Sequence, residues 1–195
     1  MTTLALVAAP ERTAGRVAYR LVLVVAGSLL VAAAAQFTIH LWFTPIPITG
    51  QTLGVLLVGA SLGAELGAAS LLLYLAEGGI GLPFFAAGSH GWSLLALTSV
   101  FGGYFWGFVV AAGVVGFLAK RGWDRSFRSA IGGMLIGEIV LYSVAIPWFA
   151  HAGHLSAQRA LVEGLYPFIV GDTLKLVAAA ALLPAAWRLL GRDRA

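Results

Sequence analysis

Long apolar stretches alternate along the chain with short segments that hold most of the charged residues. Because a bilayer core about 30 Å thick needs about 20 apolar residues per helix, each long stretch indicates a membrane span. We predict six spans, at residues 17–39, 52–63, 65–77, 94–118, 130–149 and 164–190. The second and third are short and meet at Gly63–Glu65, so we expect them to be tilted or buried inside a bundle.

The positions of arginine and lysine decide between six spans and five, the number obtained if the two short segments fuse. Six spans with a cytoplasmic N-terminus leave ten of the twelve basic residues in the cytoplasm: Arg12, Arg16, Arg20, Lys120, Arg121, Arg125, Arg128, Arg188, Arg192 and Arg194. This is the bias that membrane proteins show. We therefore predict one all-α membrane domain over residues 1–195, a multi-pass protein of the cell membrane with both termini cytoplasmic.

Composition supports this class. Of 195 residues, 60% are hydrophobic and 10% are charged, against about 25% charged in soluble domains. There are no cysteines, which excludes disulfides and thiolate metal sites. The basic residues flank apolar spans rather than forming a patch, so we expect membrane lipid and no nucleic acid as a partner.

Two charged residues interrupt the last apolar segment, Asp172 and Lys175. A charge at the centre of a span costs about 2.5–3.5 kcal/mol, so such residues are usually functional. Three positions apart on a helix, they share a face and are placed to hold a small polar or anionic molecule. The alternative is that they pair with each other and only hold the bundle together.

Two loops on the predicted outer side are unusual. Residues 40–51 contain two prolines that favour an extended path, and residues 78–93 contain five glycines, one proline and the aromatic residues Phe84, Phe85 and Trp92. A loop that is both glycine-rich and aromatic suggests a lid over the site; the alternative is an aromatic belt at the membrane interface.

Three further features leave alternatives open. Ser28 and Ala32 belong to a smooth face of the first span, which either packs within the bundle or docks a partner helix. Glu138, inside the fifth span, is either a proton carrier or a neutral, hydrogen-bonded acid. His151 and His154 lack an obvious third ligand, so we predict no metal site.

Motifs of catalysis are missing from the sequence. It contains neither the Gly-x-x-x-x-Gly-Lys-[Ser/Thr] pattern of P-loop ATPases nor the Gly-x-Ser-x-Gly pattern of serine hydrolases. We therefore predict no catalytic residues, no cofactor and no enzymatic activity.

Four blocks of sequence carry a family resemblance: Pro47–Gly63, Leu73–Gly91, Gly102–Phe108 and Pro167–Lys175. In order and spacing they resemble the biotin-binding S components of energy-coupling-factor (ECF) vitamin transporters, and the similarity covers nearly the whole chain. The family usually has Gly-Pro-Thr before the third block, whereas this chain has Ser99, Val100 and Phe101. That departure alters the expected wall of the pocket.

The resemblance implies a six-helix bundle that captures biotin as a transported substrate, with a coupling membrane subunit and ATPase subunits as partners. It implies that Asp172 and Lys175 are pocket residues and that Gln51 and Tyr104 reach the same cavity. We expect Phe84 and Trp92 to cover the apolar ring of the ligand. We expect Ser28 and Ala32 to form the docking face. Two alternatives remain, a self-sufficient carrier of biotin or a related vitamin coupled to protons through Glu138 or Asp172, and a non-transporting membrane module.

Overall fold

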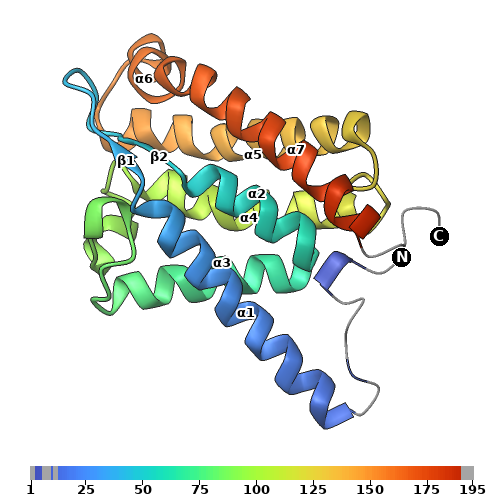
Figure 1. Cartoon of the computed structure of the whole chain (residues 1–195). Coiled ribbons are helices and arrows are strands. Elements are labelled where there is room, and N and C mark those ends of the chain that lie inside the picture. The colour runs from blue at the N-terminus through green and yellow to red at the C-terminus, as the bar shows by residue number, and fades with distance from the viewer. Residues whose placement is uncertain (1–2, 6–9, 11–12, 190–195) are drawn as a thin grey trace.

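The computed structural model describes residues 3–5, 10 and 13–189. Of the basic residues used above, Arg12, Arg192 and Arg194 lie outside this part of the chain. The described part is mostly helical (Figure 1). Its elements are α1 (Thr13–Ala35), β1 (Thr38–Ile39), β2 (Ile48–Thr49), α2 (Gln51–Leu62), α3 (Ala64–Gly79), η2 (Ala86–Gly88), η3 (Trp92–Leu95), α4 (Gly102–Ala119), α5 (Phe127–Ala152), α6 (Ala157–Gly164), η4 (Tyr166–Phe168) and α7 (Ile169–Leu189).

Helices α1, α2, α3, α4, α5 and α7 correspond to the predicted spans. By length and composition, α1, α4, α5 and the stretch Ala157–Leu189 are able to cross a membrane. Helices α2 and α3 have only 12 and 16 residues, short as predicted. Glycine lets them pack tightly: a Cβ on Gly59 would lie 2.6 Å from the carbonyl oxygen of Ala112 on α4.

Three predicted boundaries were wrong. The first helix ends at Ala35, because Thr38–Ile39 pairs with Ile48–Thr49 as a two-stranded antiparallel hairpin. The fourth begins at Gly102, after η3 and an irregular segment. The last predicted span starts too early: residue 164 ends a separate short helix, α6, which places hydrophilic side chains on one face, and α7 begins at Ile169 after η4.

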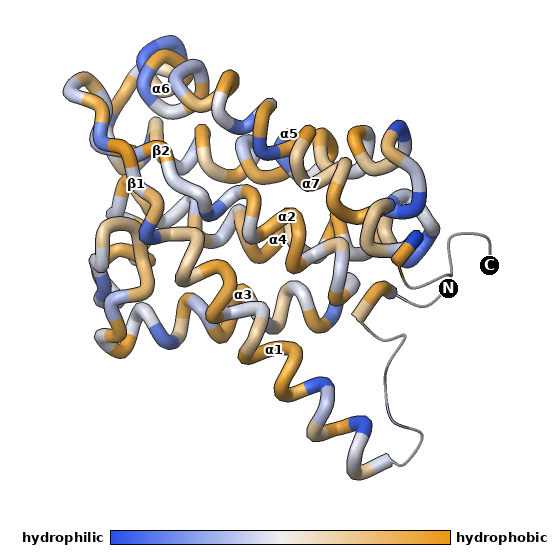
Figure 2. The backbone as a smooth tube through the Cα atoms, viewed as in Figure 1, coloured by the Kyte–Doolittle hydropathy of each residue, from blue (hydrophilic) through white to orange (hydrophobic). Residues whose placement is uncertain are grey.

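Helix α4 lies at the centre, in contact with α2, α3 and α5, while α7 packs on α5 and α2. Helix α1 contacts α3 and α2, and its N-terminal half runs away from the bundle (Figure 1). Hydrophobic residues cover much of every long helix, and hydrophilic residues gather mainly towards the ends (Figure 2). Val17, Leu21 and Val22 of α1 are exposed, as expected of a helix that faces lipid.

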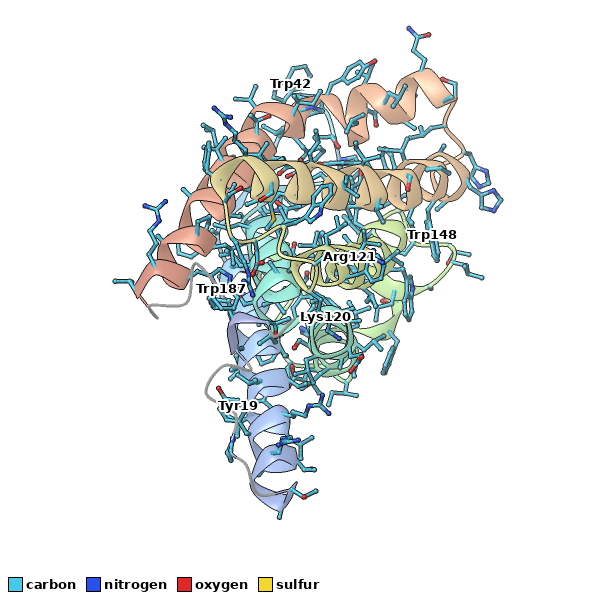
Figure 3. The ribbon with its side chains drawn as sticks, turned by 90° about the vertical axis from the view of Figure 1, so that its right-hand side faces the viewer. Tyr19, Trp42, Lys120, Arg121, Trp148 and Trp187 are labelled. Carbon is cyan, nitrogen blue, oxygen red and sulfur yellow. The ribbon has the colours of Figure 1, made fainter. Side chains whose placement is uncertain are left out.

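The molecule has two distinct ends. The β1–β2 hairpin, the loops between α3 and α4, and α6 gather at one, which we call the hairpin end (Figure 1). The α4–α5 turn and the last turn of α7 lie at the other, which we call the terminal end. Trp42 marks the tip of the hairpin and Trp187 the last part of α7 (Figure 3). The candidate site lies towards the hairpin end.

Candidate functional site

A cavity of about 300 Å³ lies between the helices and the loops of the hairpin end. This is within the usual size range of small-molecule sites. The helices contribute Gln51, Thr52, Tyr104, Phe105, Phe108, Leu141, Tyr142, Asp172 and Lys175 to its lining. The β1–β2 hairpin and the loop after α3 contribute His40, Pro45, Ile46, Pro47, Thr49, Ala86, Ala87 and Ser89. The wall is therefore largely apolar, with a small polar group on α2, α5 and α7.

Helix α7 carries Asp172 on its buried stripe. The buried residues of this helix include Asp172, Leu176, the adjacent pair Ala179 and Ala180, and Leu183, so they recur once per helical turn. Asp172 lies on the same face of α7 as these apolar residues. Because that face packs on α5 and α2, the carboxylate is buried inside the protein. Asp172, which interrupts the apolar sequence, thus lies inside the bundle. This is expected, because exposing a charge to lipid is costly.

The charged pair forms a closed hydrogen-bonded cluster with two neighbours. Lys175 Nζ donates to Asp172 Oδ1 at 2.7 Å and to Thr52 Oγ1 at 3.0 Å. Thr52 Oγ1 donates to the same Asp172 oxygen at 3.1 Å, and the Tyr142 hydroxyl donates to Asp172 Oδ2. Both Asp172 oxygens are thus satisfied, with the carboxylate side chain 2% exposed and the lysine 16%. The pair is an internal ion pair and also part of the cavity wall, and its role in holding a ligand stays a prediction.

Tyr104 lines the cavity as predicted, and its hydroxyl is already engaged. It donates to the carbonyl oxygen of Gly164 at 2.7 Å, which ties α4 to the last residue of α6. A Cβ on Gly164 would lie 2.7 Å from that hydroxyl, so the contact depends on the glycine. Tyr104 therefore fixes the segment that leads into α7.

Gln51 also lines the cavity, and its amide connects two parts of the wall. Its Nε2 donates to the Tyr74 hydroxyl at 2.6 Å, and its Oε1 accepts from Thr49 Oγ1 at 2.9 Å. The Tyr74 hydroxyl in turn donates to the carbonyl oxygen of Phe84 at 3.3 Å. This chain of hydrogen bonds links the start of α2 to the loop after α3.

Phe84 and Trp92 were expected to cover a ligand, and the structure corrects this placement. Neither is among the residues that line the cavity. The side chain of Phe85 is buried instead. Its ring centroid lies 5.4 Å from that of Tyr74 and 4.4 Å from that of Phe105. Trp92 is 57% exposed and covers Gly79, where a Cβ would lie 2.8 Å from its ring.

The loop after α3 reaches the cavity through small residues. Ala86, Ala87 and Ser89 line it, and the Ala87 N–H donates to Thr38 Oγ1 at 3.3 Å. Ala87 has a φ of 54°, a left-handed conformation that is unfavourable for alanine. Such strain is held by surrounding contacts and occurs often at binding sites. Closure of this loop as a lid stays a prediction.

Several lining residues were not predicted. Thr52 follows Gln51 directly and Tyr142 lies four residues after Glu138, so both stood beside residues that the sequence had singled out. Phe101, the last residue of the departure from the family pattern, lines the cavity. A bulky aromatic residue therefore forms the wall at the place where the family usually has threonine.

Ser28 and Ala32 do not present a docking face in this structure, which corrects that prediction. They are 0% and 5% exposed. Ser28 donates a hydrogen bond to the carboxylate of Glu77 on α3, and the neighbouring Gly27 packs against Ser70 of the same helix. The smooth face thus packs within the bundle, the other alternative that its small residues allowed.

These features define a multi-pass membrane protein with an internal cavity of ligand size. Its fold matches a solved structure described as the S-component for biotin from an ECF-type ABC transporter, with a TM-score of 0.79 and 24% identity. The match covers 92% of this chain and 95% of that one. The chain belongs to the BioY family, which it matches over residues 6–192.

Curated relatives cover most of the chain. The biotin transporter BioY of Rhizobium etli is 35% identical over 162 residues, which are 80% of this chain and 85% of that protein. The probable biotin transporter BioY of Pyrococcus horikoshii is 33% identical over 150 residues, 77% of this chain and 85% of that protein. The biotin transporter BioY of Thermotoga maritima is 31% identical over 138 residues, 71% and 79% respectively.

Proposed function

We propose that this chain captures biotin and takes it up across the cell membrane as the substrate-specific subunit of an ECF transporter. The observation that carries the proposal is the cavity lined by Asp172 and Lys175 in a chain of the BioY family. The proposal places the hairpin end at the outer face, as the distribution of arginine and lysine predicts.

The chemistry of the cavity suits biotin. The molecule has a ureido ring with two N–H donors and one carbonyl, a thioether ring and a carboxylate. Asp172 supplies a buried acceptor for the N–H groups, and Lys175 supplies a donor for either the carbonyl or the carboxylate. Phe101, Phe105 and Phe108 line the cavity and offer aromatic surface to the apolar ring system.

Transport requires no chemical step on biotin, so we propose a carrier subunit rather than an enzyme, with biotin as substrate and no cofactor. The partners would be a coupling membrane subunit and ATPase subunits, alongside membrane lipid. Because Ser28 and Ala32 are buried against α3, the proposal assigns docking to other residues.

A second candidate is a self-sufficient carrier of biotin or a related vitamin, coupled to protons. One observation favours it: Glu138 Oε1 is buried without a hydrogen-bond partner among the described residues. Biotin uptake by cells that lack the ATPase partners distinguishes the two. Uptake that persists there and stops when the proton gradient is collapsed supports the second candidate, and uptake that requires the ATPases supports the first.

Binding by the chain alone is tested with a thermal-shift titration in detergent, using biotin beside thiamine and riboflavin. A ligand that binds only the folded chain raises its stability by about 2.7 kcal/mol at a hundredfold excess over Kd. We expect a rise with biotin and none with the other two vitamins. A rise with thiamine or riboflavin instead would overturn the assignment of the substrate.

A further inference from the structure

Glu138 is a second carboxyl group close to the charged pair, and no hydrogen bond of the cluster uses it. Its Oε1 is buried and has no partner among the residues that the structure describes. An ionised carboxylate without donors is strongly disfavoured inside a membrane protein, whereas a neutral acid is tolerated there. In this arrangement of side chains Glu138 is therefore best accommodated with its proton.

The register of α5 and α7 places Glu138 beside Lys175. The two helices are antiparallel, and the hydrogen bond from Tyr142 to Asp172 fixes which residues face each other. Glu138 comes four residues before Tyr142 on α5, so it lies about 6 Å nearer to the terminal end than Tyr142. Lys175 comes three residues after Asp172 on α7, so it lies about 4.5 Å nearer to that end than Asp172. The carboxyl group and the ammonium group are thus at similar depth, and Glu138 interacts electrostatically with both Asp172 and Lys175.

Few other charges compete for this position. The titratable groups on the helices that pack against α5 are Tyr104 of α4, Arg159 and Glu163 of α6, and Asp172, Lys175 and Arg188 of α7, while α2 has none. Arg159 is paired with Glu163 at 2.6 Å. Arg188 lies thirteen residues beyond Lys175 on α7, about 20 Å further along the helix. Lys175 is therefore the cation nearest to Glu138 along these helices.

We propose that Glu138 is a proton-binding site coupled to the ligand cavity through Lys175. With the cavity empty, Glu138 keeps its proton and Lys175 bonds to Asp172 and Thr52. A ligand that donates to Asp172 Oδ1 competes with Lys175 for that oxygen. The flexible lysine, which has three N–H donors, then pairs with Glu138 while it still donates to the ligand. The O–H bond of Glu138 breaks as the proton passes to water, and a new ion pair forms.

This coupling has a defined direction, and it rests on the proposed function because biotin supplies the N–H donors. Ligand binding releases a proton, so by linkage the affinity rises with pH, by at most about tenfold per pH unit. Protonation of Glu138 has the reverse effect: it returns Lys175 to Asp172 and favours release of the ligand.

Isothermal titration calorimetry tests the proposal. Biotin is titrated into the detergent-purified full chain in two buffers of the same pH but different ionisation enthalpy, which gives the number of protons exchanged. We expect release of about one proton by the wild type and none by Glu138→Gln. Glu163→Gln is the matched control: its glutamate is paired with Arg159 on α6 and is not part of the cavity lining, so the variant should keep the full release.

Proton uptake, no exchange, or release that persists unchanged in Glu138→Gln would each overturn the proposal. The pH dependence of wild-type affinity is a second test that needs no variant: affinity that rises with pH supports the coupling, and affinity that is flat or falls refutes it. Failure of the proposed function looks different, because the wild type would then give no binding heat with biotin in either buffer.

Discussion

At the scale of single residues, Asp172 is the point where three helices meet. Its carboxylate accepts hydrogen bonds from Thr52 on α2, Tyr142 on α5 and Lys175 on its own helix, α7. A buried carboxylate is stable only while such donors remain, because losing a partner leaves a charge without compensation. The same donors orient the carboxylate towards the cavity, so stability and ligand binding depend on one group of contacts.

Tyr142→Phe tests this dependence. The variant removes the hydroxyl that donates to Asp172 Oδ2 and keeps the ring, which packs edge-on against Tyr104 with centroids 6.4 Å apart. Hydrogen bonds to charged groups contribute about 1.5–3 kcal/mol, so we expect biotin affinity to fall about tenfold or more. Equilibrium binding measures this, with the exposed Tyr166→Phe as control. Unchanged affinity in Tyr142→Phe would show that Asp172 needs no orientation by the tyrosine.

At the scale of elements, contacts far from the charged pair set its position. Helix α6 ends at Gly164, whose carbonyl oxygen accepts from Tyr104, and η4 then leads into α7. At the other end of α7, Trp187 Nε1 donates to Asp124 Oδ2 in the α4–α5 turn at 2.6 Å, and Arg125 lies over the Trp187 ring. Helix α7 is thus held at both ends.

Gly164→Ala tests the contact at the hairpin end. Its added Cβ would lie 2.7 Å from the Tyr104 hydroxyl and 2.8 Å from the Phe149 ring, so the end of α6 must move. Overpacking of this kind usually costs about 1–3 kcal/mol, and we expect weaker biotin binding together with a lower Tm. Gly113→Ala on α4 is the matched control, because its Cβ would meet nothing within 4 Å. Equal Tm and affinity in the two variants would contradict this role.

Asp124→Asn tests the contact at the terminal end through its pH dependence. Burial raises the pKa of Asp124 above the ordinary value of 3.8, so the folded chain holds this proton more tightly than the unfolded chain. The contribution of Asp124 to stability is therefore present at acid pH and is lost as pH rises above about 4. The amide of the variant would keep an acceptor for Trp187 without the charge. We expect the Tm of the variant, relative to that of the wild type, to increase as pH rises. A difference in Tm that decreases as pH rises would contradict this role of Asp124.

At the scale of the whole molecule, four long and two short apolar stretches predicted the six main helices, because a membrane leaves few alternatives to a helix. The ends of the helices were less predictable. The pairing of Thr38–Ile39 with Ile48–Thr49 joins residues across a loop, and no local pattern specifies it. Helix α6 was missed because its eight residues are too few to give a span signal.

The candidate site was predictable to the extent that its residues break the apolar pattern. Asp172 and Lys175 do so, and the family blocks added Gln51 and Tyr104; all four line the cavity. A threonine or tyrosine within a span is common, so Thr52 and Tyr142 carried no such signal. The sequence also does not say which of two adjacent residues turns inwards, which is why Phe84 was chosen where Phe85 is buried.

Equilibrium titration of the purified full chain with biotin, beside its Lys175→Ala variant, is the measurement to make first. Asp172 keeps two donors in the variant, Thr52 and Tyr142, so we expect the chain to fold with a cooperative thermal transition, at a lower Tm because the carboxylate loses its positive partner. The wild type should bind biotin, and the variant should lose at least about a hundredfold in affinity, about 2.7 kcal/mol. A folded variant that binds biotin as tightly as the wild type, or a folded wild type that does not bind it, would show that this cavity is not a biotin site.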